Sequence, residues 1–361
     1  MKVLFISKDY NLRKDGGCAV TKRNLNMIRQ ISDEVVELQI PIPSFFTRVK
    51  NVLLKEEYGS TNHVRKLLKK YLRSNWDLVF CDSSLYGGYL QQFMNKGIVT
   101  CCFYHNVERK FYRDKYKVSK KIQDKIIIPY VDYCERLSTN SSRYIITLNE
   151  RDSSQLQDYY GREADFIFPT SFEAIDVYSL MNIQQCKINT PYALFVGSNF
   201  FPNVQGLDFL FKEVAPFVQC EIRIVGSVCG AFKNRILPSN VVLEGVVDNL
   251  IPYYLHASCV VSPIFSGSGL KTKTIEALRF GKTFIGTSES LVGISPEYYT
   301  KVGYLCNTAT EFIKAMNIVS STNTLINEDS LRLFDKEYSN QAQFVRFKEF
   351  ILQITRENVT I

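Results

Sequence analysis

The chain is predicted to fold as two α/β domains, each with a doubly wound parallel sheet covered by helices. Its 361 residues are too many for one ordinary core and suit two domains. Short apolar runs alternate with helical segments along most of the chain, which is the pattern of βαβ units. This alternation is interrupted once, between Pro169 and Pro191, where no regular period is sustained.

The first domain is expected at residues 1–170. Right-handed crossovers would join its apolar runs into one parallel sheet. These candidate strands lie at residues 3–6, 35–40, 78–81, 99–104, 144–148 and 165–168. Gly16 and Gly17 follow the first run and open a helix that continues to about residue 30. They form either a tight turn or a glycine loop at a helix start.

A linker is expected at residues 171–190, and a second domain at residues 191–339. The second domain begins with a strand at residues 192–196, which a Gly197-Ser198-Asn199 turn follows. Further strands are expected at residues 222–225, 241–243, 257–261 and 283–286. Apolar residues at helical spacing between residues 339 and 355 predict a last helix.

The composition excludes several classes of protein. The ten cysteines form no C-x-x-C pair and there are only three histidines, which argues against a structural zinc site. Several cysteines fall in apolar runs, as buried free thiols in a reducing compartment do. The apolar part of the N-terminus is too short for a signal peptide. No apolar run approaches the length of a membrane span.

The stretch from residue 262 to residue 294 has the pattern of a phosphate site. An apolar run ends at Pro263, a small-residue loop follows, and helical spacing begins at Thr272. Backbone N–H groups of such a loop and of the helix N-terminus face an anion. Lys271 and Lys273 stand at that terminus, where cations oppose the helix dipole unless an anion is bound. Glu276, one turn further, suits the hydroxyls of a ribose.

This stretch also resembles other loop–helix motifs. A Gly-Ser-Gly loop before a helix is often only a turn. A Walker A motif is excluded because Thr272, not glycine, precedes Lys273. No GxGxxG dinucleotide fingerprint is found elsewhere in the chain.

The same stretch resembles the donor-site signature of GT-B glycosyltransferases, specifically the retaining glycosyltransferase family 4 (group 1) and its relatives. The matching residues are Pro263, Gly267, Gly269, Lys271, Lys273, Glu276, Ala277, Gly281, Lys282, Thr287, Gly293 and Ile294. One position departs from the pattern. Many members have two glutamates eight positions apart, and Ser268 stands where the first would be.

The resemblance implies a GT-B fold, in which two Rossmann-like domains face each other across a cleft. The last helix, within residues 340–361, would then complete the first domain. The resemblance also implies a role for Glu276 at the donor ribose and for the two lysines at the diphosphate. The expected donor-binding residues are Gly16, Gly17, Gly197, Ser198, Asn199, Gly267, Ser268, Gly269, Leu270, Lys271 and Thr272.

His105 is the third candidate catalytic residue, beside Lys273 and Glu276. It follows the apolar run 99–104, and polar groups at the carboxyl end of a parallel strand point into the ligand crevice. Taken alone it could equally be a loop histidine without a role. The resemblance places the histidine of an H-N-x-E string beside the donor sugar, and that string is present at residues 105–108.

The reaction that the resemblance implies is hexosyl transfer, with retention, from a nucleotide-diphospho sugar to a hydroxyl. The acceptor would be a saccharide or a lipid-linked molecule in polysaccharide or glycoconjugate synthesis. No D-x-D string is present, so metal-independent catalysis without a cofactor is expected. Two alternatives remain open. One is a non-transferase enzyme of the same fold, such as a nucleotide-sugar 2-epimerase, and the other is a non-catalytic nucleotide-sugar or membrane-binding module.

The basic charge of the chain lies in its first half. Residues 1–180 hold 28 Lys and Arg against 21 Asp and Glu. The excess of basic residues is concentrated at residues 45–73 and 109–125. These segments predict contact with an anionic membrane surface or a large anionic acceptor. Residues 45–54 could equally pack in the core. Nucleic acid is not expected, because no recognition motif accompanies the charge. The protein is expected in the cytoplasm, with a peripheral position at the inner face of the membrane.

Overall fold

The computed structural model describes residues 1–11, 16–183, 192–267, 269–322 and 324–356, and the chain divides into two compact units. Unit 1 comprises Met1–Pro169 and Gln343–Ile361, and unit 2 comprises Thr170–Ala342. The whole segment expected to be a linker, residues 171–190, therefore falls within unit 2. Its described part contains the helix α8 (Val177–Ile183).

Unit 1 is built on a six-stranded sheet in the order β2-β1-β3-β4-β5-β6, and every pair is parallel. All six strands predicted for this part of the chain are present. Their bounds are β1 (Lys2–Lys8), β2 (Glu34–Ile40), β3 (Leu78–Cys81), β4 (Thr100–Tyr104), β5 (Tyr144–Thr147) and β6 (Phe166–Ile167). The central strands β3 and β4 are buried along their whole length, as strands covered by helices on both faces must be.

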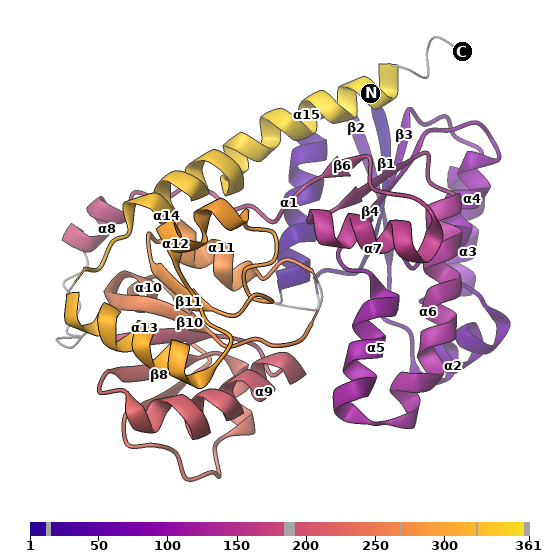
Figure 1. Cartoon of the computed structure of the whole chain (residues 1–361). Coiled ribbons are helices and arrows are strands. Elements are labelled where there is room, and N and C mark those ends of the chain that lie inside the picture. Colours follow the sequence, from indigo (N-terminus) through magenta and orange to yellow (C-terminus); the bar gives the residue numbers. More distant parts are fainter. Residues whose placement is uncertain (12–15, 184–191, 268, 323, 357–361) are drawn as a thin grey trace. The chain divides into compact units, whose positions relative to one another are not determined.

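The helices of unit 1 connect these strands (Figure 1). They are α1 (Gly16–Ile31), α2 (Phe45–Leu54), α3 (Asn62–Tyr71), α4 (Gly87–Met94), α5 (Glu108–Ser119), α6 (Ile122–Asn140) and α7 (Glu150–Tyr160). Gly16 and Gly17 form the first turn of α1 rather than a loop before it. Val64 and Leu68 of α3 are buried, so α3 is an ordinary crossover helix.

The last helix, α15 (Asn340–Arg356), contributes most of its length to unit 1. Phe347 is fully buried and stacks on Phe168, with 4.3 Å between the ring centroids. Phe350 stacks on Phe166 at 4.6 Å. The apolar stripe that predicted this helix therefore packs against the segment that includes the last strand of unit 1.

Unit 2 has a second parallel sheet of six strands, in the order β9-β8-β7-β10-β11-β12. The strands are β7 (Tyr192–Val196), β8 (Glu221–Val225), β9 (Val241–Gly245), β10 (Ala257–Ser262), β11 (Thr283–Gly286) and β12 (Gly303–Leu305). The connecting helices are α9 (Phe201–Phe209), α10 (Ile251–His256), α11 (Thr272–Arg279), α12 (Tyr299–Val302), α13 (Ala309–Thr322) and α14 (Glu328–Leu333). β12, α12, α13 and α14 were not predicted.

Numbered from its own first strand, the sheet of unit 2 has the order 3-2-1-4-5-6 of dinucleotide-binding folds. The direction of winding reverses between β7 and β10, and ligands of such sheets bind outside the carboxyl ends of the strands at that point. The loops that leave these two strand ends, with the first residue of α11, contain the described donor-binding residues predicted in this unit. In unit 1 the corresponding reversal lies between β1 and β3.

Candidate active site

The loop after β10 adopts a backbone conformation that requires its glycines. Gly267 has φ 136° and Gly269 has φ 67°, both in the region that side chains with a Cβ avoid. Ser268 lies outside the described residues. The loop leads directly into α11, whose N-cap residue is Lys271. The side chain of this N-cap residue makes no capping bond, and of the first-turn N–H groups that of Thr274 bonds to the Lys271 carbonyl, which leaves those of Thr272 and Lys273 for a ligand.

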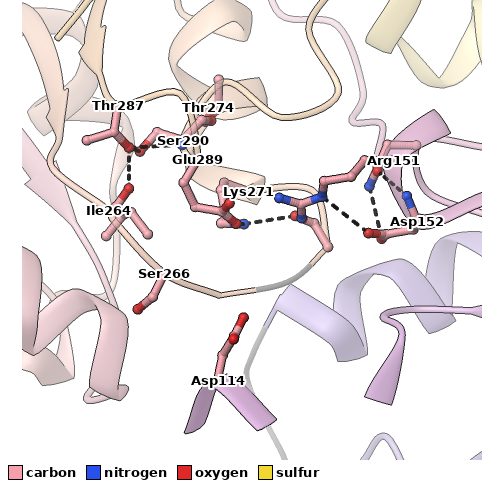
Figure 2. A network of polar contacts seen from close by, with 12 residues as sticks. Asp114, Arg151, Asp152, Ile264, Ser266, Lys271, Thr274, Thr287, Glu289 and Ser290 are labelled. Atoms are coloured by element: carbon pink, nitrogen blue, oxygen red, sulfur yellow. Dashed lines mark hydrogen bonds and ion pairs between the residues drawn. The ribbon is translucent and has the colours of Figure 1, made fainter. Parts of the chain in front are cut away.

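Lys271 lies along the loop rather than in solvent. Its Nζ donates to the Gly269 carbonyl at 2.9 Å and forms an ion pair with Glu289 at 2.8 Å (Figure 2). Its side chain is only 12% exposed. An anionic ligand would therefore share the Lys271 ammonium with Glu289, a residue that was not among the predicted site residues.

Lys273 turns toward the end of β7. Its Nζ donates to Asn203 Oδ1 at 2.6 Å and lies 4.2 Å from the centre of the Phe195 ring. Burial is the main cause that lowers the pKa of Lys273 to about 7, and repulsion from Lys271 is the second. The two lysines predicted for the diphosphate thus differ, because Lys271 has a carboxylate partner whereas Asn203 offers Lys273 only a neutral oxygen.

Asn203 connects Lys273 to the loop after β7. It is buried, and its Nδ2 donates to the Ser198 carbonyl at 2.9 Å. The next residue, Asn199, donates its backbone N–H to Ser227 Oγ at 2.9 Å. A Cβ at Gly197 would lie 3.0 Å from Asn203 Nδ2, so this glycine leaves room for the connection. The loop predicted to approach the phosphates is therefore joined to α11 by one side chain.

Glu276 lies one turn into α11. Burial raises its pKa, while Arg279, Tyr254 and Lys273 act in the opposite direction. The hydroxyl of Tyr254 is 3.5 Å from Glu276 Oε2, which is a long and weak hydrogen bond. A carboxylate held this loosely retains the capacity to accept stronger bonds from hydroxyls of a ligand.

A polar network behind the loop holds it against the sheet (Figure 2). Thr287 donates its hydroxyl to the Ile264 carbonyl, and Ser290 donates to the Ser262 carbonyl at 2.6 Å. Thr274, on α11, donates to the Ser290 carbonyl at 2.7 Å. These bonds join the start of the loop and α11 to one turn after β11, so both ends of the loop are anchored without a ligand.

In unit 1, His105 follows β4 and bonds to a buried carboxylate. Its Nε2 lies 2.9 Å from Oδ2 of Asp82, the residue directly after β3. Asp82 is 1% exposed and also accepts bonds from Thr21 Oγ1 at 2.5 Å and Asn24 Nδ2 at 2.7 Å, both on α1. His105 keeps 20% of its side chain exposed. Asp82 therefore orients an imidazole that a ligand can still reach.

A second buried carboxylate supports the loop that carries His105. Glu135 on α6 is fully buried and accepts the backbone N–H groups of Glu108 at 2.7 Å and Arg109 at 2.9 Å. It also accepts from Tyr160 at 3.0 Å and from Ser84 at 3.3 Å. Burial raises the pKa of Glu135 to about 8. Glu135 thereby joins the segments that follow Asp82 and His105.

Sequence reasoning did not identify Asp82, Glu135 or Glu289. Asp82 had a signal, because it is a polar residue directly after a buried strand, as His105 is. Glu135 and Glu289 had none, since each looks like an ordinary surface carboxylate until its partners are placed. Gly16 and Gly17 lie in unit 1, and the other predicted donor-binding residues lie in unit 2.

Comparison with known proteins identifies the family of unit 2 and the fold of the chain. Residues 190–321 match the family Glycosyl transferases group 1. No curated protein matches the chain. Sucrose-phosphate synthase from Thermosynechococcus elongatus is similar in structure, with a TM-score of 0.76, 15% identity and 99% of each chain covered.

Two further solved structures are similar over nearly the whole chain. Anabaena HepE in complex with UDP-glucose has a TM-score of 0.68 at 12% identity, covering 98% of this chain and 100% of the other. The lipopolysaccharide outer core galactosyltransferase WaaB has a TM-score of 0.63 at 13% identity, covering 98% and 99%. The chain therefore has the GT-B fold over nearly its whole length, and its residues 190–321 match the group 1 glycosyl transferase family.

Proposed function

We propose that the protein transfers a hexosyl group, with retention, from a nucleotide-diphospho sugar to a hydroxyl of a saccharide or lipid-linked acceptor. The observation that carries this proposal is the anion site of unit 2. Two lysines and an uncapped helix N-terminus adjoin a loop whose two described glycines have positive φ, at the point where the sheet reverses. A diphosphate has the charge and the length to meet both lysines.

The proposed chemistry is electrostatic. The bond between the anomeric carbon and the diphosphate breaks while the acceptor hydroxyl forms its bond on the same face of that carbon. The hydroxyl proton passes to the departing phosphate oxygen, on which negative charge grows. Lys271, Lys273 and the N–H groups of the loop would stabilise that charge without a divalent metal. Glu276 would accept bonds from the ribose hydroxyls. His105, oriented by Asp82, would contact the donor sugar.

The named relatives support a choice of substrate. Anabaena HepE is described in complex with UDP-glucose, so UDP-hexoses are the first donors to test. WaaB is named a lipopolysaccharide galactosyltransferase, which supports an acceptor in glycoconjugate or polysaccharide synthesis. Seven buried cysteines in the described residues are free thiols, which supports a reducing compartment. None of the described helices is both long and apolar enough to span a membrane. We propose that the protein lies in the cytoplasm, at the inner face of the membrane.

The test is release of nucleoside diphosphate from a UDP-hexose, with and without saccharide acceptors and with a chelator present. Release that depends on an acceptor and survives the chelator is expected. Epimerised donor without release would instead favour the 2-epimerase. Donor binding without any turnover across acceptors would favour a non-catalytic module.

Calorimetry with UDP tests the phosphate assignment. Lys273→Ala should weaken binding by about 2 kcal/mol, the loss of a charge-assisted contact. Lys271→Ala should have a smaller effect, because Glu289 already compensates part of its charge. Lys212→Ala, at an exposed position of the same unit, is the control. Unchanged affinity in both site variants would end the assignment.

A 2′-deoxy nucleotide tests the role of Glu276. Wild type should bind 2′-deoxy-UDP about tenfold more weakly than UDP, and Glu276→Ala should bind the two equally. If Glu276→Ala still discriminates between the two nucleotides, Glu276 is a structural residue of α11 and not a ribose ligand.

A further inference from the structure

Helix α2 presents its apolar side chains to solvent and its polar side chain to the protein. Asn51 is its buried residue, and Asn51 Nδ2 donates to the carbonyls of Glu57 at 3.1 Å and Ser60 at 3.2 Å. Phe46 is 83% exposed and Leu53 is 76% exposed. The other exposed apolar side chains of this helix are Phe45, Val49 and Leu54. This orientation is the reverse of an ordinary surface helix.

The orientation of α2 is held by specific bonds. Ser44 caps the first turn through the N–H of Thr47, and Lys55 ends the helix in the left-handed conformation, with φ 52°. Val52 packs on the core of unit 1. Five large apolar side chains are thus kept in water by a helix that could not bury them without breaking the Asn51 bonds, which indicates an interaction surface.

The first half of α6 continues the same surface. Ile122 and Ile126 are exposed, and they share one face of α6 with Tyr133. The segment directly after α2 contacts α6 within unit 1, because Tyr130 donates to the Glu56 carbonyl at 2.8 Å (Figure 1). Lys55 also lies 5.3 Å from the centre of the Tyr133 ring. We call this the α2–α6 surface, formed by Phe45, Phe46, Val49, Leu53, Leu54, Val118, Ile122 and Ile126.

Basic side chains accompany this apolar surface. Residues 45–55 contain three basic and no acidic residues. The two acids near the α5–α6 turn are buried and already paired, Asp114 with Lys110 and Lys117, and Asp124 with Lys115 and Ser119. The exposed basic residues of the surface are Arg48, Lys50, Lys55, Lys117, Lys120, Lys121 and Lys125.

We propose that the α2–α6 surface inserts its apolar side chains into the interface of an anionic lipid bilayer. Protruding apolar side chains surrounded by basic residues match an acyl boundary beneath anionic head groups. A second copy of this chain fits less well, because it would bring two basic surfaces together. α3 is excluded from the surface, since its apolar residues Val64 and Leu68 are buried and Arg65 pairs with Glu56 at 2.9 Å. The inference stands apart from the proposed activity, because lipid binding needs neither donor nor acceptor.

Tryptophan probes test insertion directly. The chain has one tryptophan, Trp76, which is buried, so Trp76→Phe provides a silent background. Phe46→Trp and Ile122→Trp should each shift emission to the blue with phosphatidylcholine vesicles that contain phosphatidylglycerol. Phe217→Trp, at a 64% exposed position in unit 2, is the matched control and should not shift.

Co-sedimentation with the same vesicles measures how much the apolar and the basic side chains each contribute to lipid binding. Phe46→Ser with Leu53→Ser should lower partitioning at least about tenfold, whereas Phe217→Ser should not. Charge reversal at Arg48 and Lys50 should abolish binding at low salt, while Lys348→Glu on α15 should leave it unchanged. Because the replaced side chains are exposed, the melting temperatures should remain close to wild type.

Four outcomes would overturn the proposal. The first is no blue shift at either α2 or α6 with anionic vesicles. The second is equal binding to neutral and anionic vesicles. The third is self-association without lipid that Phe46→Ser removes, measured by sedimentation velocity, which would make the surface an interface between copies. A shift at Phe46→Trp alone would exclude α6 and so refute the joint surface.

Discussion

Single side chains decide the electrostatics of the anion site. Lys271 and Lys273 stand two residues apart, yet one pairs with a carboxylate and the other bonds only a neutral amide oxygen. Burial next to another ammonium disfavours the charged form of Lys273 and lowers its pKa to about 7. A bound diphosphate would favour the charged form again, so binding of the donor is coupled to uptake of a proton.

This coupling predicts how donor affinity depends on pH. Below pH 7 Lys273 is charged before binding, and affinity is constant. As the pH rises above about 7, the free site loses its proton, and affinity for UDP-glucose should fall by up to about tenfold per pH unit. The sugar diphosphate itself does not titrate in this range. Calorimetry in buffers of different ionisation enthalpy should show proton uptake at pH 8.

Lys273→Met is the control for that experiment. It should bind more weakly than wild type, and its affinity should not change between pH 7 and pH 8. A wild-type affinity that stays constant over the same interval would contradict the coupling, whatever the effect of the substitution.

At the scale of elements, the candidate site is assembled where loops meet neighbouring strand ends. The loop after β10 is tied to the turn after β11 by Thr287 and Ser290, and to the loop after β7 through Lys273 and Asn203. In unit 1, Glu135 of α6 holds the first N–H groups of α5. Helices distant in sequence therefore set the position of His105.

Glu135→Gln tests this positioning. One amide –NH₂ would replace an oxygen that accepts backbone N–H groups, so the start of α5 should loosen and unit 1 should lose about 1–3 kcal/mol of stability. We expect kcat to fall while KM for the donor stays near wild type, because the phosphate site lies in the other unit. Asp132→Asn, one turn away, is the matched control, since Asp132 holds only side chains, those of Arg109, Arg136 and Tyr160. A purely structural role would lower stability without changing kcat of the folded fraction.

At the scale of the whole molecule, unit 1 is built from both ends of the chain, residues 1–169 and 343–361. α15 lies in the sequence after all of unit 2, yet Phe347 stacks on Phe168 and meets Phe80 edge-on at 6.2 Å. The N-terminal segment alone therefore leaves an apolar face uncovered, and unit 1 is completed only when the C-terminal helix is present.

Phe347→Ala should destabilise unit 1 by about 3–5 kcal/mol, the usual cost of removing a buried aromatic ring. Trp76 lies in the core of unit 1, so its fluorescence during urea unfolding reports this unit. Val345→Ala, at an exposed position of the same helix, should leave the transition in place. An unchanged midpoint for Phe347→Ala would show that α15 does not support unit 1.

The sequence by itself determined the elements and the class of fold. Period-two and period-3.6 patterns depend on local burial, so the strands of unit 1 and the strand–loop–helix around Lys271 could be predicted from residues alone. β12 escaped prediction because a three-residue strand, Gly303–Leu305, is too short to show a period.

Only the tertiary structure decided which polar groups meet. Asp82 and His105 are 23 residues apart, and Lys271 and Glu289 are 18 apart, so no spacing rule could pair them. The direction in which α2 faces was also undecided, because an amphipathic pattern says that one side is apolar but not which side the protein covers. The bonds of Asn51 to two backbone carbonyls settled it, and those bonds exist only once the chain after α2 has folded back.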